Sequence, residues 1–254
     1  MQIPQQLLEL IRKVKRVAVL TGPGILAEGG SGFGDPNHPL WSRFRPEDLA
    51  NAEAFRRDPG LVWGWYEWRR AALRHHKVNP AHTALVTLEH RVPEFMLITQ
   101  NVDGLHAAAG SRHLVELHGN LMRDRCSAGC KAGAGVDGTG VDDAGVDDNE
   151  PPPRCPGCGA PLRPDVLWPG EALPEETLRA AHKAVSECEL FFVIGTAAPV
   201  PPAAIFPRLA LESGAALVEI NRDETAISGG AHATLRGPAA LVLPHLLQTA
   251  WPAN

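Results

Sequence analysis

The sequence predicts an α/β fold in which a doubly wound parallel sheet is joined to a smaller domain of helices and a cysteine-bearing ribbon. Three observations support this prediction. Continuous apolar runs alternate with helical patterns, a glycine-rich turn follows the first apolar run, and two cysteine pairs stand near the middle of the chain. Alternating strands and helices are typical of a parallel sheet that is covered on both faces.

The amino-acid composition limits the classes of protein to which the chain can belong. The chain has 254 residues, of which 44% are hydrophobic, so it can bury a large core. Its 24 basic and 29 acidic residues give a net charge of -5, which provides no electrostatic reason to expect binding to nucleic acid or membranes. No signal peptide and no run long enough to cross a bilayer is recognisable. We therefore expect a cytoplasmic protein, in which five cysteines indicate metal ligands or buried thiols.

Four apolar runs are predicted to be buried parallel strands, at residues 17–20, 95–99, 190–195 and 216–220. An amphipathic helix is expected before the first of them. Each run is followed by glycine or short polar residues, in the segments "TGPG", "QNVDG", "GTAAPV" and "NRDE". Because ligands of such sheets bind outside the carboxyl ends of the strands, these segments are expected to converge on one crevice.

Other stretches are predicted to lie outside the sheet. Two helices broken at Asp58-Pro59-Gly60 are expected after residue 40, and the segment 29–41 is too rich in glycine and proline for regular structure. The acidic segment 131–153, in which "GVD" recurs, is expected to be a solvated loop tip. A calcium-binding repeat is the alternative there, although its five-residue period fits no loop geometry that we can justify.

The turn after the first strand carries "GPGILA", which has the form G-x-G-x-x-A of a dinucleotide-binding turn. There, Gly22 and Gly24 would let the backbone approach a phosphate, and the following helix N-terminus would supply positive potential. The acidic residue that an ordinary dinucleotide-binding domain places about twenty positions later has no counterpart at the end of a second strand. A standard dehydrogenase is therefore not expected.

The cysteines form the strongest metal signal in the chain. Cys126 and Cys130 are separated by three residues, Cys155 and Cys158 by two, and 24 residues lie between the pairs. Four thiolates in two pairs suit a closed tetrahedral zinc site, whose role is structural because no coordination position stays open. Four unrelated thiols are the alternative.

Polar residues after the run at 95–99, and after the short apolar stretch "LVEL", point to acid–base chemistry. In "TQNVDGLH", Asn101 and Asp103 provide an amide and a carboxylate that can bind a carboxamide, a ribose or a water. In "LHGN", His118 provides an imidazole, a side chain that can take a proton from a sugar hydroxyl. A purely structural histidine is the alternative.

Taken in order, "GPGILAE", "TQNVDGLHAAAG", "LHGN", the two cysteine pairs, "RPDVLWPGE", "IGTAAPVPPAAIF" and "EIN" resemble the sirtuin family of NAD-dependent protein-lysine deacylases. The resemblance spans nearly the whole chain and is closest to the bacterial desuccinylase and demalonylase-like subgroup. It implies a Rossmann-like, doubly wound domain formed by residues 1–39, 79–122 and 164–254. It further implies a small domain formed by a helical module, 40–78, and a zinc ribbon, 123–163.

The resemblance also implies the chemistry and its residues. NAD is the cosubstrate, acylated lysines in proteins are the partners, and nicotinamide and O-acyl-ADP-ribose are the products. His118 would be the general base, Asn101 would orient ribose and water, and Asp103 would hold the carboxamide. The implied NAD-binding residues are Gly22, Gly24, Ala27, Glu28, Phe33, Gln100, Asn101, Asp103, Gly195, Thr196 and Asn221. A monomer that contacts neither nucleic acid nor membrane is expected.

A pair of residues on one predicted helix points to the acyl group. Tyr66, the only tyrosine, and Arg69 stand at i and i+3 and therefore share a helical face. This Y-x-x-R pattern resembles that of the sirtuins that remove malonyl and succinyl groups, in which a phenol and a guanidinium receive the distal carboxylate. A planar guanidinium suits that task because it pairs bidentately with carboxylates. A packing helix with a solvated arginine is the alternative.

The first turn departs from the family pattern. Pro23 lacks an amide hydrogen, Leu26 replaces a serine, and Asp35 stands where a gapless match puts an arginine. Two alternatives to a deacylase therefore remain: a catalytically weakened NAD or ADP-ribose sensor, and an enzyme that passes ADP-ribose to a protein or to water. A zinc-ribbon nucleic-acid binder would need a basic patch around the cysteines, whose loop is acidic.

Overall fold

The computed structural model describes residues 3–26, 43–130, 136–137, 151–198 and 201–252. Ala27, Glu28 and Phe33 lie outside the described residues. So do the whole of the segment 29–41 and most of the segment 131–153, of which Val136–Asp137 is described and forms a short strand.

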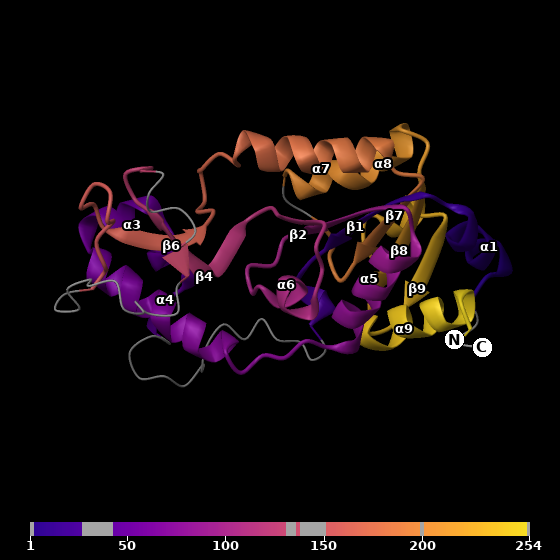
Figure 1. Ribbon diagram of the computed structural model, residues 1–254, viewed down its shortest axis with the longest axis horizontal. Helices are drawn as coiled ribbons and strands as arrows, with labels where there is room; N and C mark the ends of the chain where they lie inside the picture. Colours follow the sequence, from indigo (N-terminus) through magenta and orange to yellow (C-terminus); the bar gives the residue numbers. More distant parts are fainter. Residues whose placement is uncertain (1–2, 27–42, 131–135, 138–150, 199–200, 253–254) are drawn as a thin grey trace.

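A parallel sheet forms the centre of the larger part, with the strand order β3-β2-β1-β7-β8-β9 (Figure 1). Its strands are β1 (Arg16–Thr21), β2 (Glu94–Thr99), β3 (Leu114–Glu116), β7 (Leu190–Ile194), β8 (Ala216–Asn221) and β9 (Ala233–Arg236). All of their pairings are parallel. The predicted doubly wound sheet is therefore confirmed, and the predicted apolar runs supply four of its strands.

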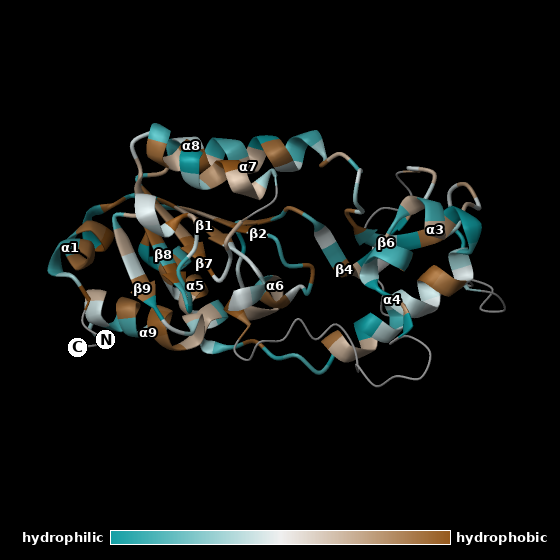
Figure 2. Cartoon of the chain, turned by 180° about the vertical axis from the view of Figure 1, so that it is seen from behind, coloured by the Kyte–Doolittle hydropathy of each residue, from teal (hydrophilic) through white to brown (hydrophobic). Residues whose placement is uncertain are grey.

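Helices cover both faces of this sheet. One face carries α1 (Gln5–Lys13), α5 (Pro80–Arg91) and α9 (Ala239–Ala250), and the other carries α7 (Glu175–Glu187) and α8 (Phe206–Glu212) (Figures 1 and 2). Successive side chains of a strand point to opposite faces, so Val17 and Val19 join one apolar core while Ala18 and Leu20 join the other. Burial on both faces explains why these strands read as continuous apolar runs.

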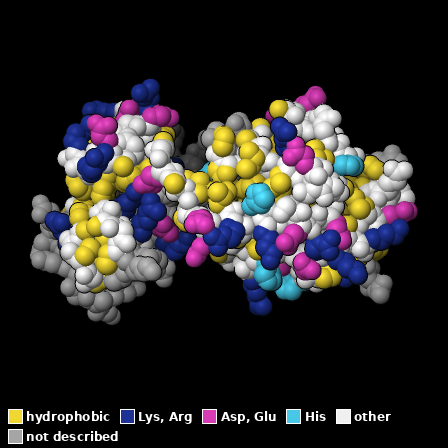
Figure 3. Space-filling view, turned by 90° about the horizontal axis from the view of Figure 1, so that it is seen from above, with side chains coloured by type: hydrophobic (Ala, Val, Ile, Leu, Met, Phe, Trp, Pro, Cys, Tyr) yellow, Lys and Arg dark blue, Asp and Glu magenta, His cyan; other side chains and the backbone are white. Residues whose placement is uncertain are grey.

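A smaller part lies at the end of the molecule opposite α1 (Figure 1). Its antiparallel sheet has the order β5-β4-β6, formed by β5 (Val136–Asp137), β4 (Gly119–Cys126) and β6 (Leu162–Val166). Against it pack α2 (Pro46–Leu49), α3 (Ala52–Arg57) and α4 (Pro59–Leu73). Figure 3 shows the two parts as lobes joined by a narrower waist, with basic and acidic side chains interspersed on the visible face.

The predicted helix break at Asp58 is confirmed. The Asp58 carboxylate accepts a hydrogen bond from Leu61 N at 2.9 Å, and Pro59 is the first residue of α4. A capping carboxylate satisfies one of the unpaired amides of the first turn, and proline at that position loses no hydrogen bond. The chain therefore ends α3 and starts α4 within two residues.

Arg70 fixes α4 against the small sheet. Its side chain is fully buried, and it donates to Leu121 O at 2.6 Å and to an Asp124 carboxylate oxygen at 2.5 Å. Burial raises the pKa of Asp124 to about 6, against the opposing effect of Arg70. A buried charge that loses its partner costs about 3–5 kcal/mol, so this pair strongly constrains the position of α4.

The described helices include none that is both long and apolar enough to cross a membrane.

Candidate active site

The carboxyl ends of β1 and β7 meet at the point where the strand order reverses direction, which is where ligands of doubly wound sheets bind. Gly24 N donates to Gly195 O at 2.8 Å, and Gly22 N donates to Ile194 O at 3.1 Å. A Cβ on Gly24 would lie 2.8 Å from Gly195 O, closer than real Cβ atoms approach, and Gly195 has a φ of 62°. These glycines therefore serve first to let two loops of the chain touch.

The rest of the first turn is held by its surroundings. Pro23 is the first residue of a short 3₁₀ helix, η1 (Pro23–Ile25), and Leu26 follows it as a buried residue. The Asn79 side chain donates to Ile25 O at 2.8 Å and also accepts from Ala81 N at 2.8 Å, which caps α5. One amide side chain thus ties the turn after β1 to the start of α5.

Thr196 connects three of the predicted crevice segments. Its hydroxyl oxygen accepts a hydrogen bond from Gln100 Nε2 at 2.9 Å and another from Ala198 N at 2.8 Å. Asn221 Nδ2 donates to Thr196 O at 3.4 Å. The segments that follow β2, β7 and β8 therefore converge as the sequence predicted.

A buried polar network runs beneath this crevice. The Thr21 hydroxyl donates to Thr99 Oγ1 at 2.8 Å, and Asn101 N donates to the same oxygen at 3.1 Å. His106 Nε2 lies 2.9 Å from Thr21 Oγ1. Because the single hydroxyl hydrogen of Thr21 points to Thr99, His106 must donate through Nε2.

The His106 ring packs edge-on against that of His82, with their centroids 4.8 Å apart. Both rings are almost completely buried. Burial lowers the pKa of His82 to about 4 and the pKa of His106 to about 3. Both are therefore neutral at physiological pH and support the site without titrating there.

Asn101 and Asp103 line the same region and are both buried. Asn101 Nδ2 has no hydrogen-bond partner among the described residues. A buried amide without a partner is costly, so the position suits a ligand that brings an acceptor. Asp103 accepts from Leu105 N at 2.9 Å, and burial raises the pKa of its carboxyl.

His118 lies in the turn that leads from β3 of the large sheet to β4 of the small sheet. Its Nδ1 is 3.0 Å from Gln100 O, and its carbonyl accepts a hydrogen bond from Leu167 N at 2.9 Å. A carbonyl oxygen can only accept, so Nδ1 carries the hydrogen and Nε2 of the neutral ring keeps a lone pair. This arrangement prepares Nε2 to take a proton.

A cavity of about 480 Å³ opens beside His118. Its volume is in the range of pockets that hold small organic groups. Its lining combines charged and polar side chains with apolar ones. The lining includes Tyr66, Arg69, Val102, His118, Trp168 and Glu171. The structure therefore brings the Y-x-x-R pair and the candidate base to one cavity.

The phenol of Tyr66 is buried and held in place. Trp168 Nε1 donates to Tyr66 Oη at 2.8 Å. Burial raises the pKa of the Tyr66 phenol, and the hydrogen bond from Trp168 opposes that shift. The Arg69 guanidinium carbon lies 4.6 Å from the centroid of the Trp65 ring and 5.7 Å from that of Tyr66, and burial lowers the pKa of Arg69.

Three of the four predicted zinc ligands lie together. The Sγ atoms of Cys126, Cys155 and Cys158 lie within 4.8 Å of one another, and Cys126 Sγ is 3.5 Å from Cys158 Sγ. Zinc–sulfur bonds of about 2.3 Å in a tetrahedron separate the sulfurs by about 3.8 Å, so the three thiolates fit one structural zinc ion. Cys130 packs against the same cluster, but its Sγ is not within that group.

Residues 22–202 match the family model described as the Sir2 family. The chain belongs to the Sir2 family. Among its Sir2 relatives, an NAD-dependent protein deacylase of Methylococcus capsulatus is 45% identical over 249 residues, which is 98% of this chain and 97% of that protein. NAD-dependent protein deacylase 1 of Pseudomonas aeruginosa is 45% identical over 245 residues, with 96% and 98% covered.

Solved Sir2 structures share the fold. The crystal structure of a Sir2 homologue in complex with NAD gives a TM-score of 0.84 at 39% identity, covering 98% of this chain and 94% of that chain. A mutant Sir2 homologue in complex with 2'-O-acetyl ADP-ribose gives a TM-score of 0.81 at 41% identity, with 98% and 96% covered.

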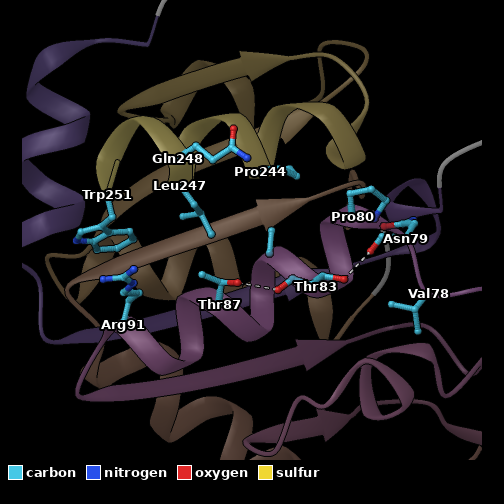
Figure 4. Close-up of a pocket in the computed structure, with 11 residues that line it drawn as sticks. Val78, Asn79, Pro80, Thr83, Thr87, Arg91, Pro244, Leu247, Gln248 and Trp251 are labelled. Carbon is cyan, nitrogen blue, oxygen red and sulfur yellow. Dashed lines mark hydrogen bonds between the residues drawn. The ribbon is translucent and has the colours of Figure 1, made fainter. Parts of the chain in front are cut away.

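A second cavity of similar volume lies between α5 and α9, and Asn79 is part of its lining (Figure 4). Thr83, Thr87 and Arg91 border it from α5, and Leu247 and Trp251 border it from the other side (Figure 4). Its described lining contains no carboxylate, histidine or cysteine.

Several residues of the candidate site were not predicted from the sequence. Trp168 and Glu171 belong to the segment "RPDVLWPGE", in which no pattern assigned them a role. His106 carries no spacing signal because its partner Thr21 is distant in sequence, and the local pattern around Asn79 and His82 indicates only the start of α5. The sequence holds no local signal for the role of Trp168, because its hydrogen bond to Tyr66 joins residues that are 102 positions apart.

Proposed function

We propose that this protein is an NAD-dependent protein-lysine deacylase that favours acyl groups ending in a carboxylate. The proposal rests above all on one cavity, whose walls include the base candidate His118 and the carboxylate-binding candidates Tyr66 and Arg69. The reaction consumes acyl-lysine, NAD and water, and it yields lysine, nicotinamide and O-acyl-ADP-ribose.

In this proposal each residue has a defined role. His118 Nε2 accepts a proton from a ribose hydroxyl, since Nδ1 is committed to Gln100 O. The Asn101 amide, whose Nδ2 is unpaired among the described residues, donates to ribose or water. Asp103 accepts from the carboxamide of nicotinamide. Gly22, Gly24, Gly195, Thr196 and Asn221 hold the dinucleotide, and Gln100 lies beside the nicotinamide ribose.

The acyl preference follows from charge and donors. Arg69 supplies a guanidinium, and Tyr66 supplies a phenol hydroxyl, at the wall of the cavity. A carboxylate only accepts hydrogen bonds, so two donors and one positive charge favour succinyl or malonyl over acetyl.

The remaining parts of the proposal concern organisation. We assign residues 1–39, 79–122 and 164–254 to an NAD-binding domain, and 40–78 with 123–163 to a small domain. The limits at 122 and 164 fall inside β4 and β6. Cys130 completes the zinc site as fourth ligand. The protein acts as a cytoplasmic monomer on acylated lysines and does not bind nucleic acid or membranes.

The test uses purified protein, NAD and one lysine peptide carrying acetyl, malonyl or succinyl. Peptide mass and nicotinamide release are followed together, with His118→Ala as the control. The proposal expects NAD-dependent loss of malonyl or succinyl that exceeds loss of acetyl and disappears in the control. Arg69→Lys should reduce the loss of succinyl but spare the loss of acetyl, because it keeps the charge and loses the planar fork.

The two alternatives give different results in the same assay. Binding of NAD without release of nicotinamide would favour the sensor, a function suggested by Pro23 and Leu26 in the first turn. Release of nicotinamide with ADP-ribose attached to protein, or set free, would favour ADP-ribosyl transfer.

A further inference from the structure

We propose that Trp168 is a positioning residue that fixes the direction of the Tyr66 hydroxyl and so sets the preference for acyl groups that end in a carboxylate. This inference rests on the proposed function of Tyr66 and Arg69. It adds a residue from another element, since Tyr66 lies in α4 and Trp168 lies just after β6.

The first step concerns which group donates in the hydrogen bond between Trp168 and Tyr66. An indole nitrogen only donates, so the 2.8 Å contact between Trp168 Nε1 and Tyr66 Oη uses a lone pair of the phenol oxygen. The phenol hydrogen cannot point along that direction. It is therefore left to donate elsewhere, and both rings line the cavity. The hydrogen bond occupies one acceptor direction of the Tyr66 oxygen and leaves the O–H to donate away from Trp168.

The second step concerns what holds the indole. The Arg163 guanidinium carbon lies 3.3 Å from the centroid of the Trp168 ring. Arg163 in turn donates to both carboxylate oxygens of Glu171, at 2.5 and 3.0 Å, and Trp168 N donates to Glu171 at 2.8 Å. Burial alone would raise the pKa of Glu171, but its hydrogen bonds hold the pKa below its usual value.

This stacking has two consequences for the indole. A cation over the ring face is attracted to its electrons and draws them away from the N–H, which makes Nε1 a stronger donor. The paired Arg163 and Glu171 also prevent the ring from turning, because Glu171 binds the backbone and Arg163 binds the face of the same residue. One series of contacts therefore leads to the cavity, from Glu171 and Arg163 through Trp168 to Tyr66.

The third step concerns selectivity. The Tyr66 O–H and the Arg69 guanidinium both donate hydrogen bonds. They therefore match a carboxylate, which only accepts hydrogen bonds. An acetyl group has no distal oxygen to use that donor. Loss of the indole N–H should therefore weaken binding of succinyl-lysine more than binding of acetyl-lysine.

The test compares Trp168→Phe with Trp63→Phe. Both changes remove an indole from a buried position, but Trp63 packs in the cluster around Cys126 and Cys155 and is not part of the cavity lining. Steady-state kinetics and binding are measured with succinyl- and acetyl-lysine peptides. We expect Trp168→Phe to raise KM and Kd for the succinyl peptide about tenfold, the size of one lost hydrogen bond. Acetyl values should rise less than succinyl values, so that the ratio of the two shifts in Trp168→Phe, and Trp63→Phe should preserve that ratio.

A spectroscopic readout tests the hydrogen bond itself. Tyr66 is the only tyrosine, so 3,5-difluorotyrosine labels this position alone and gives a single ¹⁹F signal to titrate. A donor to the phenol oxygen stabilises the phenolate, so Trp168→Phe should move the titration to higher pH. Trp63→Phe should leave it in place.

The outcomes separate this inference from the proposed function. If the wild type prefers succinyl but Trp168→Phe keeps both the preference and the titration, this inference alone is overturned. If the wild type neither binds nor processes succinyl peptides better than acetyl peptides, the acyl preference proposed for Tyr66 and Arg69 fails, and the role of Trp168 fails with it. The Kd values decide the question even in a protein without turnover.

Discussion

His118 donates through Nδ1 to Gln100 O at 3.0 Å, and Gln100 is the residue that directly follows β2. Gln100 also donates through its side chain to Thr196, beyond the end of β7. The backbone carbonyl of Gln100 therefore orients the His118 imidazole, which lies where the two lobes join. Gln100 in turn connects the ends of β2 and β7 through its side chain. The free lone pair on Nε2 is a consequence of this contact.

The first prediction concerns that base. His118→Ala should lower formation of deacylated peptide by about 10²- to 10⁴-fold, the usual contribution of a positioned acid or base. NAD affinity should change little, because the substitution leaves the glycine turn intact. Calorimetry and single-turnover assays measure the two quantities separately. Equal loss of NAD affinity and rate would argue that His118 supports the fold rather than the proton transfer.

The second prediction concerns the crossing of the two loops. A Cβ on Gly24 would lie 2.8 Å from Gly195 O and 2.9 Å from Gly195 Cα, so Gly24→Ala must displace backbone. Such overpacking costs about 1–3 kcal/mol of unfolding free energy, and NAD affinity should fall as well. Gly229→Ala is the matched control, since its Cβ would meet nothing within 4 Å. Denaturant unfolding that shows equal stability for both variants would contradict the packing seen here.

The third prediction concerns the metal. The purified protein should contain one zinc per chain, and Cys155→Ser should lose it and unfold at a lower temperature, because structural zinc contributes folding free energy directly. Elemental analysis and thermal unfolding provide the measurements. Cys130→Ser should lose zinc to a similar degree. Full zinc occupancy in that variant would mean that the fourth ligand is another group.

The fourth prediction concerns acid stability. The pKa values of His82 and His106 fall from an ordinary 6.5 to about 4 and about 3. Below pH 6.5 the two histidines of the unfolded chain therefore bind protons, whereas those of the folded protein stay neutral. The free energy of unfolding consequently decreases as the pH falls. The expected loss is about 1.4 kcal/mol per pH unit for each histidine between pH 6 and pH 4.

The measurement is urea unfolding at several pH values, for the wild type and for a variant with His82→Gln and His106→Gln. The raised pKa of Asp124 acts in the opposite direction, because the folded protein takes up that proton first, but it acts equally in both proteins. The difference between the two slopes isolates the histidines. Parallel curves would mean that the two rings are accessible to protons in the folded state.

The strand pattern of the large sheet could be predicted from the sequence for a simple reason. Strands buried on both faces need apolar side chains at every position, and the turns after them need glycine or short polar residues, so both leave a local signature. The break at Asp58 and the cysteine pairs are equally local. The short strands β3 and β9 leave no such signature, because three or four residues hold too little pattern.

The composition of the site could be predicted only in part. The sequence by itself determined which residue types are available: the glycines of the first turn, the amide, carboxylate and imidazole after the strands, and the phenol and guanidinium one helical turn apart. The tertiary structure alone decided how they are used. Hydrogen bonds from Trp168 to Tyr66 and from His118 to Gln100 join residues that are 102 and 18 positions apart, and contacts of that kind depend on tertiary packing rather than on any local pattern.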